Sequence, residues 1–263
     1  MIESRQLCIG YRTARQTHCV QAGLDFCLPS SRLVSLIGPN GSGKSTLLRT
    51  IGGLQPALSG ELSIDGKAFA SMSLAERARR LAMVLTDRIS IEHCRVRDLV
   101  ATARYPYQGR FKSLTQEDNE LIDRAIEATH LENLATRSID RLSDGERQRV
   151  MIAKALAQDT PVILLDEPTS HLDLPNRIEV MVLLRRLSEE FSKSILISTH
   201  EIETALQLSD TLWLLRPSSG GMLCGSPEEL LSAGAIQREF AHPSFRINAS
   251  GKLDFVLKED GKA

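Results

Sequence analysis

A glycine-rich segment between an apolar run and a helical pattern constrains the fold of this chain most strongly. It matches the pattern GxxxxGK[ST] and consists of Gly38, Pro39, Asn40, Gly41, Ser42, Gly43, Lys44, Ser45 and Thr46. Leu33 to Ile37 precede it, and a helical pattern runs from Lys44 to Ile51. In such a strand–loop–helix unit, backbone N–H groups and the helix start converge on one point and can bind a polyphosphate. The segment therefore predicts a phosphate-binding loop, in preference to a glycine turn beside an exposed lysine. In such a loop Lys44 can bridge the outer phosphates, and the hydroxyl of Ser45 can ligate Mg²⁺.

Two adjacent carboxylates follow a second apolar run. Val162 to Leu165 lead directly into Asp166 and Glu167. Ligands collect at the carboxyl ends of the strands in an α/β sheet. We therefore expect Asp166 to hold Mg²⁺ through its water shell, and Glu167 to act as the general base on the attacking water. The alternative is a helix cap after a strand.

The distribution of apolar runs predicts an α/β fold. Continuous runs at 33–37, 162–165, 194–198 and 211–215 are typical of parallel strands buried on both faces. Helical patterns lie between them, as at Pro175 to Phe191. Short strand patterns with turns fill the first sixty-odd residues, at 7–11, 20–28 and 60–65. Residues 88–160 instead favour helices, including Gln116 to Leu134 with Thr115 and Asp118 as a capping pair.

Composition excludes several classes of protein. The chain has 263 residues, with 32 basic and 33 acidic side chains and a net charge of −1, so no nucleic-acid-binding footprint is indicated. No apolar run approaches the ~18–20 residues that cross a bilayer, and the first residues do not resemble a secretory signal. The five cysteines form no CxxC pair, which favours free thiols over a disulfide or zinc framework.

One further segment decides between families of phosphate-loop proteins. It reads Leu142, Ser143, Asp144, Gly145 and Glu146. Ser143 and Glu146 form an S-x-x-E capping box before a helix predicted from Arg147 to Gln158, and a helix start is a second anion site. The segment resembles the LSGGQ signature of the ATP-binding subunits of ABC transporters, with Asp and Glu substituted. This resemblance spans nearly the whole chain.

The resemblance implies a site shared by two chains. In the family, the signature (here Ser143, Asp144, Gly145 and Glu146) binds the γ-phosphate of ATP held by the other protomer, so two chains pair head to tail. Tyr11 matches the aromatic that stacks on adenine, and Asp173 ends the loop that crosses the dimer. His200 matches the switch histidine. A packed strand tyrosine and a strand-end helix cap are the alternatives for Tyr11 and His200.

The chain departs from the family at one metal ligand. The family usually carries a glutamine at the end of a strand in the middle region, where it ligates Mg²⁺. Here the matching position is Thr86, with Asp87 as a candidate replacement if the alignment is off by one. The expected metal ligands are therefore Ser45, Asp166 and Thr86.

The resemblance also implies a division of the chain into subdomains and a particular group of importers within the family. We expect one ABC ATPase domain over 1–263, with a P-loop NTPase (RecA-like) core at 1–87 and 161–215. That core would hold a mostly parallel sheet and an N-terminal antiparallel β subdomain. A helical insertion would span about 88–160 and a short extension 216–263. Residues 104–109 and 158–169 are similar to importers of iron–siderophore, haem and cobalamin chelates.

Such an importer subunit implies partners outside this chain. It would use ATP and Mg²⁺, form a homodimer, and dock through Thr86 to Gly109 on a permease dimer at the cytoplasmic face of the membrane. A substrate-binding protein would take part indirectly, and nucleic acid would not. The alternative is a soluble ABC ATPase, such as an iron–sulfur assembly factor. A P-loop kinase would leave the 142–146 segment and His200 unexplained.

Overall fold

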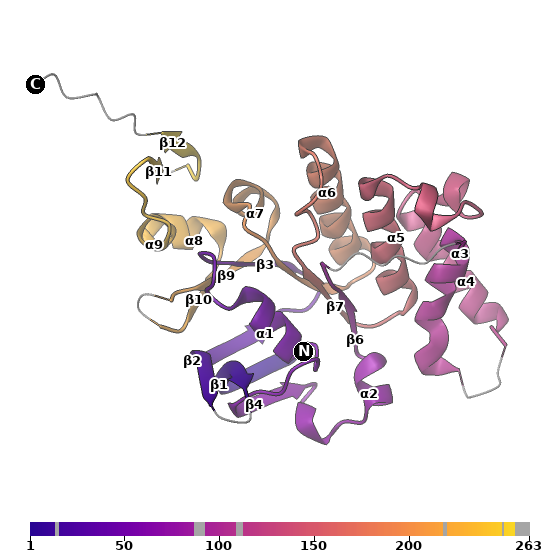
Figure 1. Ribbon diagram of the computed structural model, residues 1–263, viewed down its shortest axis with the longest axis horizontal. Helices are drawn as coiled ribbons and strands as arrows, with labels where there is room; N and C mark the ends of the chain where they lie inside the picture. Colours follow the sequence, from indigo (N-terminus) through magenta and orange to yellow (C-terminus); the bar gives the residue numbers. More distant parts are fainter. Residues whose placement is uncertain (14–15, 87–92, 109–112, 218–219, 249, 256–263) are drawn as a thin grey trace, which may run out of the picture.

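The carboxyl ends of the central strands meet at one edge of a sheet. The computed structural model describes residues 1–13, 16–86, 93–108, 113–217, 220–248 and 250–255 (Figure 1). Its described strands include a six-stranded sheet in the order β10-β9-β3-β8-β7-β6. These strands are β3 (Leu33–Ile37), β6 (Leu81–Val84), β7 (Val162–Asp166), β8 (Ser194–Ser198), β9 (Thr211–Leu215) and β10 (Met222–Gly225). All neighbours pair in parallel except β10 and β9. The predicted mostly parallel sheet is confirmed.

A second sheet packs with the first around helix α1. It contains β1 (Ile2–Arg12), β2 (Thr17–Leu28), β4 (Ser59–Ile64) and β5 (Lys67–Ala68), and all of its neighbours are antiparallel. Helix α1 (Lys44–Ile51) has the predicted bounds. Leu47 of α1 shares one buried cluster with Ile9 of β1 and Leu36 of β3. This packing fixes the start of α1, and with it the phosphate loop, between the two sheets (Figure 1).

Helices dominate the described residues between β6 and β7. They are α3 (Val96–Ala101), the 3₁₀ helix η2 (Thr102–Tyr107), α4 (Gln116–Ala128), the 3₁₀ helices η3 (Glu132–Leu134) and η4 (Ile139–Arg141), and α5 (Asp144–Ala157). The predicted helix from Gln116 to Leu134 is too long. The Thr129 hydroxyl donates to the carbonyls of Ala125 and Ile126, and His130 adopts a left-handed φ of 55°, which ends α4. Helix α5 begins at Asp144, earlier than predicted, because Ser143 caps it directly.

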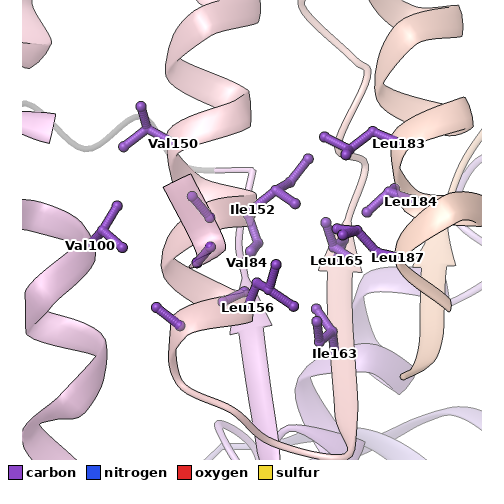
Figure 2. Close-up of a cluster of buried hydrophobic side chains, with 14 of the residues drawn as sticks. Val84, Val100, Val150, Ile152, Leu156, Ile163, Leu165, Leu183, Leu184 and Leu187 are labelled. Atoms are coloured by element: carbon purple, nitrogen blue, oxygen red, sulfur yellow. The ribbon is translucent and has the colours of Figure 1, made fainter. Parts of the chain in front are cut away.

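The helical region shares its core with the central sheet. Figure 2 shows Ile152 and Leu156 of α5 beside Leu184 of helix α6 (Leu174–Glu190) and the strand residues Val84 and Leu165. Helix α6 buries Met181 and Leu184, whereas Ile178 and Val182 lie on its exposed side. The position of α5 is therefore fixed from both sides, by the sheet and by α6.

The residues after β9 form more structure than the sequence predicts. Helix α7 (Ile202–Leu208) precedes β9. Ser226 caps the N-terminus of helix α8 (Pro227–Ser232). Helix α9 (Ala235–Glu239) and the hairpin of β11 (Phe245–Ile247) and β12 (Leu253–Phe255) are additional. Ile236 and Ile247 pack against Leu212 and Leu214 of β9.

The segment after β5 adds η1 (Phe69–Ser71) and α2 (Leu74–Ala78). Of the helices that the structure describes, none is long and apolar enough to span a membrane.

Candidate active site

The predicted phosphate loop joins β3 to α1 and leads directly into the helix. Gly43 precedes α1 with a left-handed φ of 100°, and a Cβ at this position would lie 2.7 Å from Cγ1 of Val20. Only glycine fits there without strain. The hydroxyl of Ser42 is 1% exposed and finds no hydrogen-bond partner among the described residues. A buried unpaired hydroxyl in this loop fits a site that receives its partner from a ligand.

The Lys44 amine folds back over the loop. Its Nζ donates to the carbonyl of Gly38 at 2.8 Å and to that of Pro39 at 3.2 Å. Burial lowers the pKa of Lys44, and the nearby carboxylates of Glu167 and Asp166 oppose that shift. The amine is thus held among carbonyl acceptors where a phosphate anion would offer a charged partner.

Asp166 lies at the centre of a hydroxyl network. Its Oδ1 accepts from the hydroxyl of Ser45 at 2.9 Å and from that of Ser198 at 2.7 Å. Asp166 is 3% exposed. The side chains come from the phosphate loop, β7 and β8, so the strand order brings together residues that lie far apart in the sequence. An aspartate oxygen beside a serine hydroxyl is a donor set that suits a hard divalent cation with ligands from phosphate.

Thr86 lies beside this network, at the position predicted from the family. Its hydroxyl donates to the backbone carbonyl of Asp166 at 2.8 Å. Thr86 therefore links the end of β6 to the end of β7. Asp87, the other candidate for this metal position, lies outside the described residues. Within the described ranges there is no group of three or more His, Cys, Asp or Glu side chains that could hold a metal ion.

Glu167 and His200 face each other at the ends of β7 and β8. His200 Nδ1 lies 3.8 Å from Glu167 Oε2. Glu167 has a left-handed φ of 46°, and its backbone N–H donates to the hydroxyl of Ser198 at 2.9 Å. His200 is half exposed, at 48% of its side chain. The structure thus brings the two predicted catalytic residues together.

Tyr11, near the end of β1, contacts the last residue of the phosphate-loop motif. Its hydroxyl and that of Thr46 are 2.7 Å apart, and 47% of Tyr11 is exposed. A tyrosine packed inside the sheet would be buried, so this alternative is not what the structure shows. The exposure leaves the ring accessible for stacking.

The predicted signature segment forms the N-terminus of α5. Ser143 accepts from the N–H of Glu146 at 3.3 Å, and the Ser143 N–H donates to Glu146 Oε2 at 2.8 Å. These bonds lower the pKa of Glu146, with the backbone bond from Ser143 as the largest cause. Asp144 of this turn and Glu167 both line one cavity of about 60 Å³. A Cβ on buried Gly145 would lie 2.4 Å from Oδ1 of Asn176, so α5 approaches α6 closely here.

The loop that ends at Asp173 is tied to the residue after His200. Asp173 caps α6 by accepting from the N–H of Asn176 at 3.1 Å. Glu201 accepts from the hydroxyl of Thr169 at 3.0 Å and lies 3.5 Å from Arg177. Sequence reasoning missed this link, because Glu201 carries no motif and its partners are distant in the chain. It also missed Ser198, whose only signal is a hydroxyl at the end of an apolar strand.

The segment predicted to dock a partner, Thr86 to Gly109, contains η2. Tyr105 is 66% exposed. Tyr107 packs inward, with the guanidinium of Arg104 over its ring at 4.1 Å, and Arg104 Nε donates to Asp118 at 2.8 Å in a buried pair. Pro106 accepts from Arg79 Nε at 3.0 Å. Among the large hydrophobic side chains that the structure describes in this segment, Tyr105 is the exposed one, and Gly109 lies outside the described residues.

Fold and site together define a P-loop ATPase. The family model described as ABC transporter matches residues 22–170. The chain belongs to this family and is one of its ATP-binding, ATP-hydrolysing subunits.

Curated relatives and a solved structure agree with this assignment. The Petrobactin import ATP-binding protein FpuC of Bacillus anthracis is 41% identical, over 89% of this chain and 86% of the relative. The Ferric enterobactin transport ATP-binding protein FepC of Escherichia coli is 35% identical, over 90% and 86%. The dimeric structure of MJ0796, a bacterial ABC transporter cassette, has a TM-score of 0.73 and 26% identity, and the match covers 86% of this chain and 99% of that one. The predicted resemblance to iron-chelate importers is confirmed, and the alternative of an assembly factor is not favoured.

Proposed function

We propose that this chain is the ATPase of a membrane importer for an iron chelate. The convergence of the phosphate loop, Asp166, Glu167 and His200 at one sheet edge carries the ATPase part of the proposal. The substrate class is supported by the names of the relatives, which import petrobactin and transport ferric enterobactin. The importer group that this chain resembles also includes importers of haem and cobalamin, so these chelates are further candidate substrates.

The proposed chemistry uses side chains that already lie close together. Lys44 would leave its two carbonyl partners to bind the outer phosphates. Ser45 and Asp166 would hold Mg²⁺, with Thr86 beside them, and the ion would neutralise phosphate charge. Glu167 would accept the proton of the attacking water, and His200 would contact the γ-phosphate next to it.

A homodimer would complete each nucleotide site. Tyr11 would stack on the adenine of ATP in one protomer. Ser143, Asp144, Gly145 and Glu146 of the other protomer would contact the γ-phosphate, and the loop ending at Asp173 would cross between them. The dimeric cassette of MJ0796 supports this arrangement.

The importer would also need a permease and a place at the membrane. We propose that the homodimer docks on the cytoplasmic face of a transmembrane permease dimer through residues 86–109, with Tyr105 at the contact. The exposure of Tyr105 supports this position. A substrate-binding protein would deliver the chelate to the permease and would not touch this chain.

The Glu167→Gln variant tests the ATPase assignment. Removing a general base typically costs ~10²–10⁴-fold in rate, so turnover should fall by this factor while ATP binding is retained. Steady-state phosphate release and equilibrium nucleotide binding measure the two quantities. Glu179→Gln is the control, because Glu179 is an exposed glutamate on α6 that pairs with Arg149. Wild-type turnover in Glu167→Gln would overturn the assignment.

Copurification tests the transporter assignment separately. Tyr105→Asp should reduce recovery of the chain with its permease and leave the ATPase of the free chain intact. Tyr107→Phe is the control, since it keeps the ring that packs on Arg104. Recovery with a soluble assembly complex instead of a permease would contradict the transporter proposal and leave the ATPase assignment standing.

A further inference from the structure

One hydroxyl bonds to both acidic residues of the site, to the carboxylate of Asp166 and to the backbone of Glu167, and has no role in the proposed chemistry. It belongs to Ser198, the last residue of β8. Its Oγ donates to Asp166 Oδ1 at 2.7 Å and accepts from the backbone N–H of Glu167 at 2.9 Å. One side chain thus contacts both the proposed metal ligand and the proposed base.

The hydroxyl uses its donor and an acceptor position at once. A serine hydroxyl has a single hydrogen, and here that hydrogen is directed at Asp166. Ser198 is 0% exposed, so water cannot reach this position to replace a lost hydrogen bond. Removal of the hydroxyl would leave both partners short of a hydrogen bond in a buried position.

The second bond, from the Glu167 N–H to Ser198, restrains a backbone in an unusual conformation. Glu167 has a φ of 46°, in the left-handed region that residues with side chains seldom occupy. Such a conformation persists where the surroundings fix it. The bond from the Glu167 N–H to Ser198 is one such restraint, and it sets the direction in which the carboxylate leaves β7.

We infer that Ser198 is a positioning residue for ATP hydrolysis: its hydroxyl holds Asp166 and Glu167 in a fixed mutual arrangement. This inference rests on the proposed roles of those two carboxylates. Ser45 shares Asp166 Oδ1 but comes from the phosphate loop, whereas Ser198 comes from the neighbouring strand. Ser198 therefore couples the carboxylates to the rigid sheet and not to the loop.

Two pairs of variants separate this role from a general effect on folding. Ser198→Thr keeps the hydroxyl, and Ser198→Val has the same shape without it. Ser198→Ala removes the hydroxyl with no added bulk. Ser35→Ala is the matched control: Ser35 is also a 0% exposed serine of this sheet, and its hydroxyl pairs with Ser209 at 2.6 Å, away from the carboxylates.

The expected result is a loss of kcat with KM for ATP unchanged at saturating Mg²⁺. Removing an outer-shell partner of a metal ligand typically costs ~10–100-fold in activity or metal affinity, and we expect this from Ser198→Ala and Ser198→Val. Ser198→Thr should restore kcat, and Ser35→Ala should keep it. A second readout needs no turnover: Mn²⁺ binding with a non-hydrolysable ATP analogue, measured by electron paramagnetic resonance, should weaken in Ser198→Ala. Hydrogen exchange at the Glu167 amide should accelerate in the same variant.

Two outcomes would overturn the inference. The first is wild-type kcat and Mn²⁺ affinity in Ser198→Ala. The second is an equal loss in Ser35→Ala, which would reduce the effect to general stability. If Ser198→Val does not fold, wild type and Ser198→Ala still form a pair that differs only in the hydroxyl. The Glu167→Gln result is independent, so wild-type turnover there would reject the proposed base and not the hydrogen bonds of Ser198.

Discussion

Two helices begin near the proposed phosphate site, and their first turns differ in chemistry. Helix α1 starts after Gly43, has no acidic residue in its first turn, and begins with Lys44. Helix α5 starts after Ser143, has Asp144 and Glu146 in its first turn, and closes a complete capping box. Both starts carry positive potential from backbone N–H groups. Only at the start of α5 do side chains accept hydrogen bonds from some of these N–H groups.

The difference indicates an order of binding. A glycine cannot cap a helix with a side chain, so the first N–H groups of α1 are left for a ligand, with Lys44 beside them. In α5 the hydroxyl of Ser143 is already bonded to Glu146. A single chain should therefore bind nucleotide through α1, and α5 should contribute when a second chain supplies the phosphate.

The largest expected effect is on the α1 side. Lys44→Ala removes the charged partner of the outer phosphates, and hydrogen bonds to charged groups are worth ~1.5–3 kcal/mol, so ATP affinity of the single chain should fall about 10–150-fold. Titration with a fluorescent ATP analogue measures it. Lys67→Ala, which removes an exposed lysine paired with Glu76, is the control. Unchanged affinity in Lys44→Ala would mean that α1 is not the primary site.

The next largest effect is on stability and concerns the space around Gly43, the glycine that precedes α1. Gly41 and Gly43 both have left-handed φ values, 78° and 100°, but a Cβ on Gly41 meets nothing within 4 Å, whereas one on Gly43 meets Val20 at 2.7 Å. Gly43→Ala should cost ~1–3 kcal/mol more of unfolding free energy than Gly41→Ala, because it adds overpacking to backbone strain. Chemical denaturation compares the two, and equal losses would show that the loop tolerates a side chain before α1.

The smallest expected effect is on the α5 side and depends on pH. The pKa of Glu146 is lowered from 4.5 by its bonds to Ser143. The stability that this carboxylate contributes is present above pH 4.5 and is lost as pH falls through the lowered value, because protonation then favours the unfolded chain. Glu146→Gln should flatten the acid limb of the stability profile. An unchanged limb would show that the capping box contributes nothing through its charge.

The sequence predicted the phosphate loop and the carboxylates because each depends on neighbours in the chain. Apolar runs fix β3, β8 and β9 to their observed bounds, and the motif after β3 places Lys44 and Ser45 at the start of a helix. The capping boxes at Ser143 and Thr115 are also local, and both are present.

What the sequence did not reveal depends on contacts between distant segments. Ser198 contacts Asp166 from the neighbouring strand, and Glu201 contacts Thr169 and Arg177 from another loop. No periodicity encodes such pairs. The short β10 and the hairpin of β11 and β12 were missed because short strands carry little pattern. The domain boundaries at 88, 160 and 216 and the individual site roles stay predictions.

ATP-driven dimerisation in a hydrolysis-deficient background tests the account most directly. Light scattering would compare Glu167→Gln with the double variant Glu167→Gln, Ser143→Arg, each with and without ATP, while ATP bound per chain is measured on the same samples. We predict that ATP converts Glu167→Gln from monomer to dimer, and that the double variant binds ATP with the same affinity but stays monomeric. Dimerisation of the double variant at the same ATP concentration, or loss of its ATP binding as a monomer, would contradict a site in which α1 of one chain and α5 of the other hold one nucleotide.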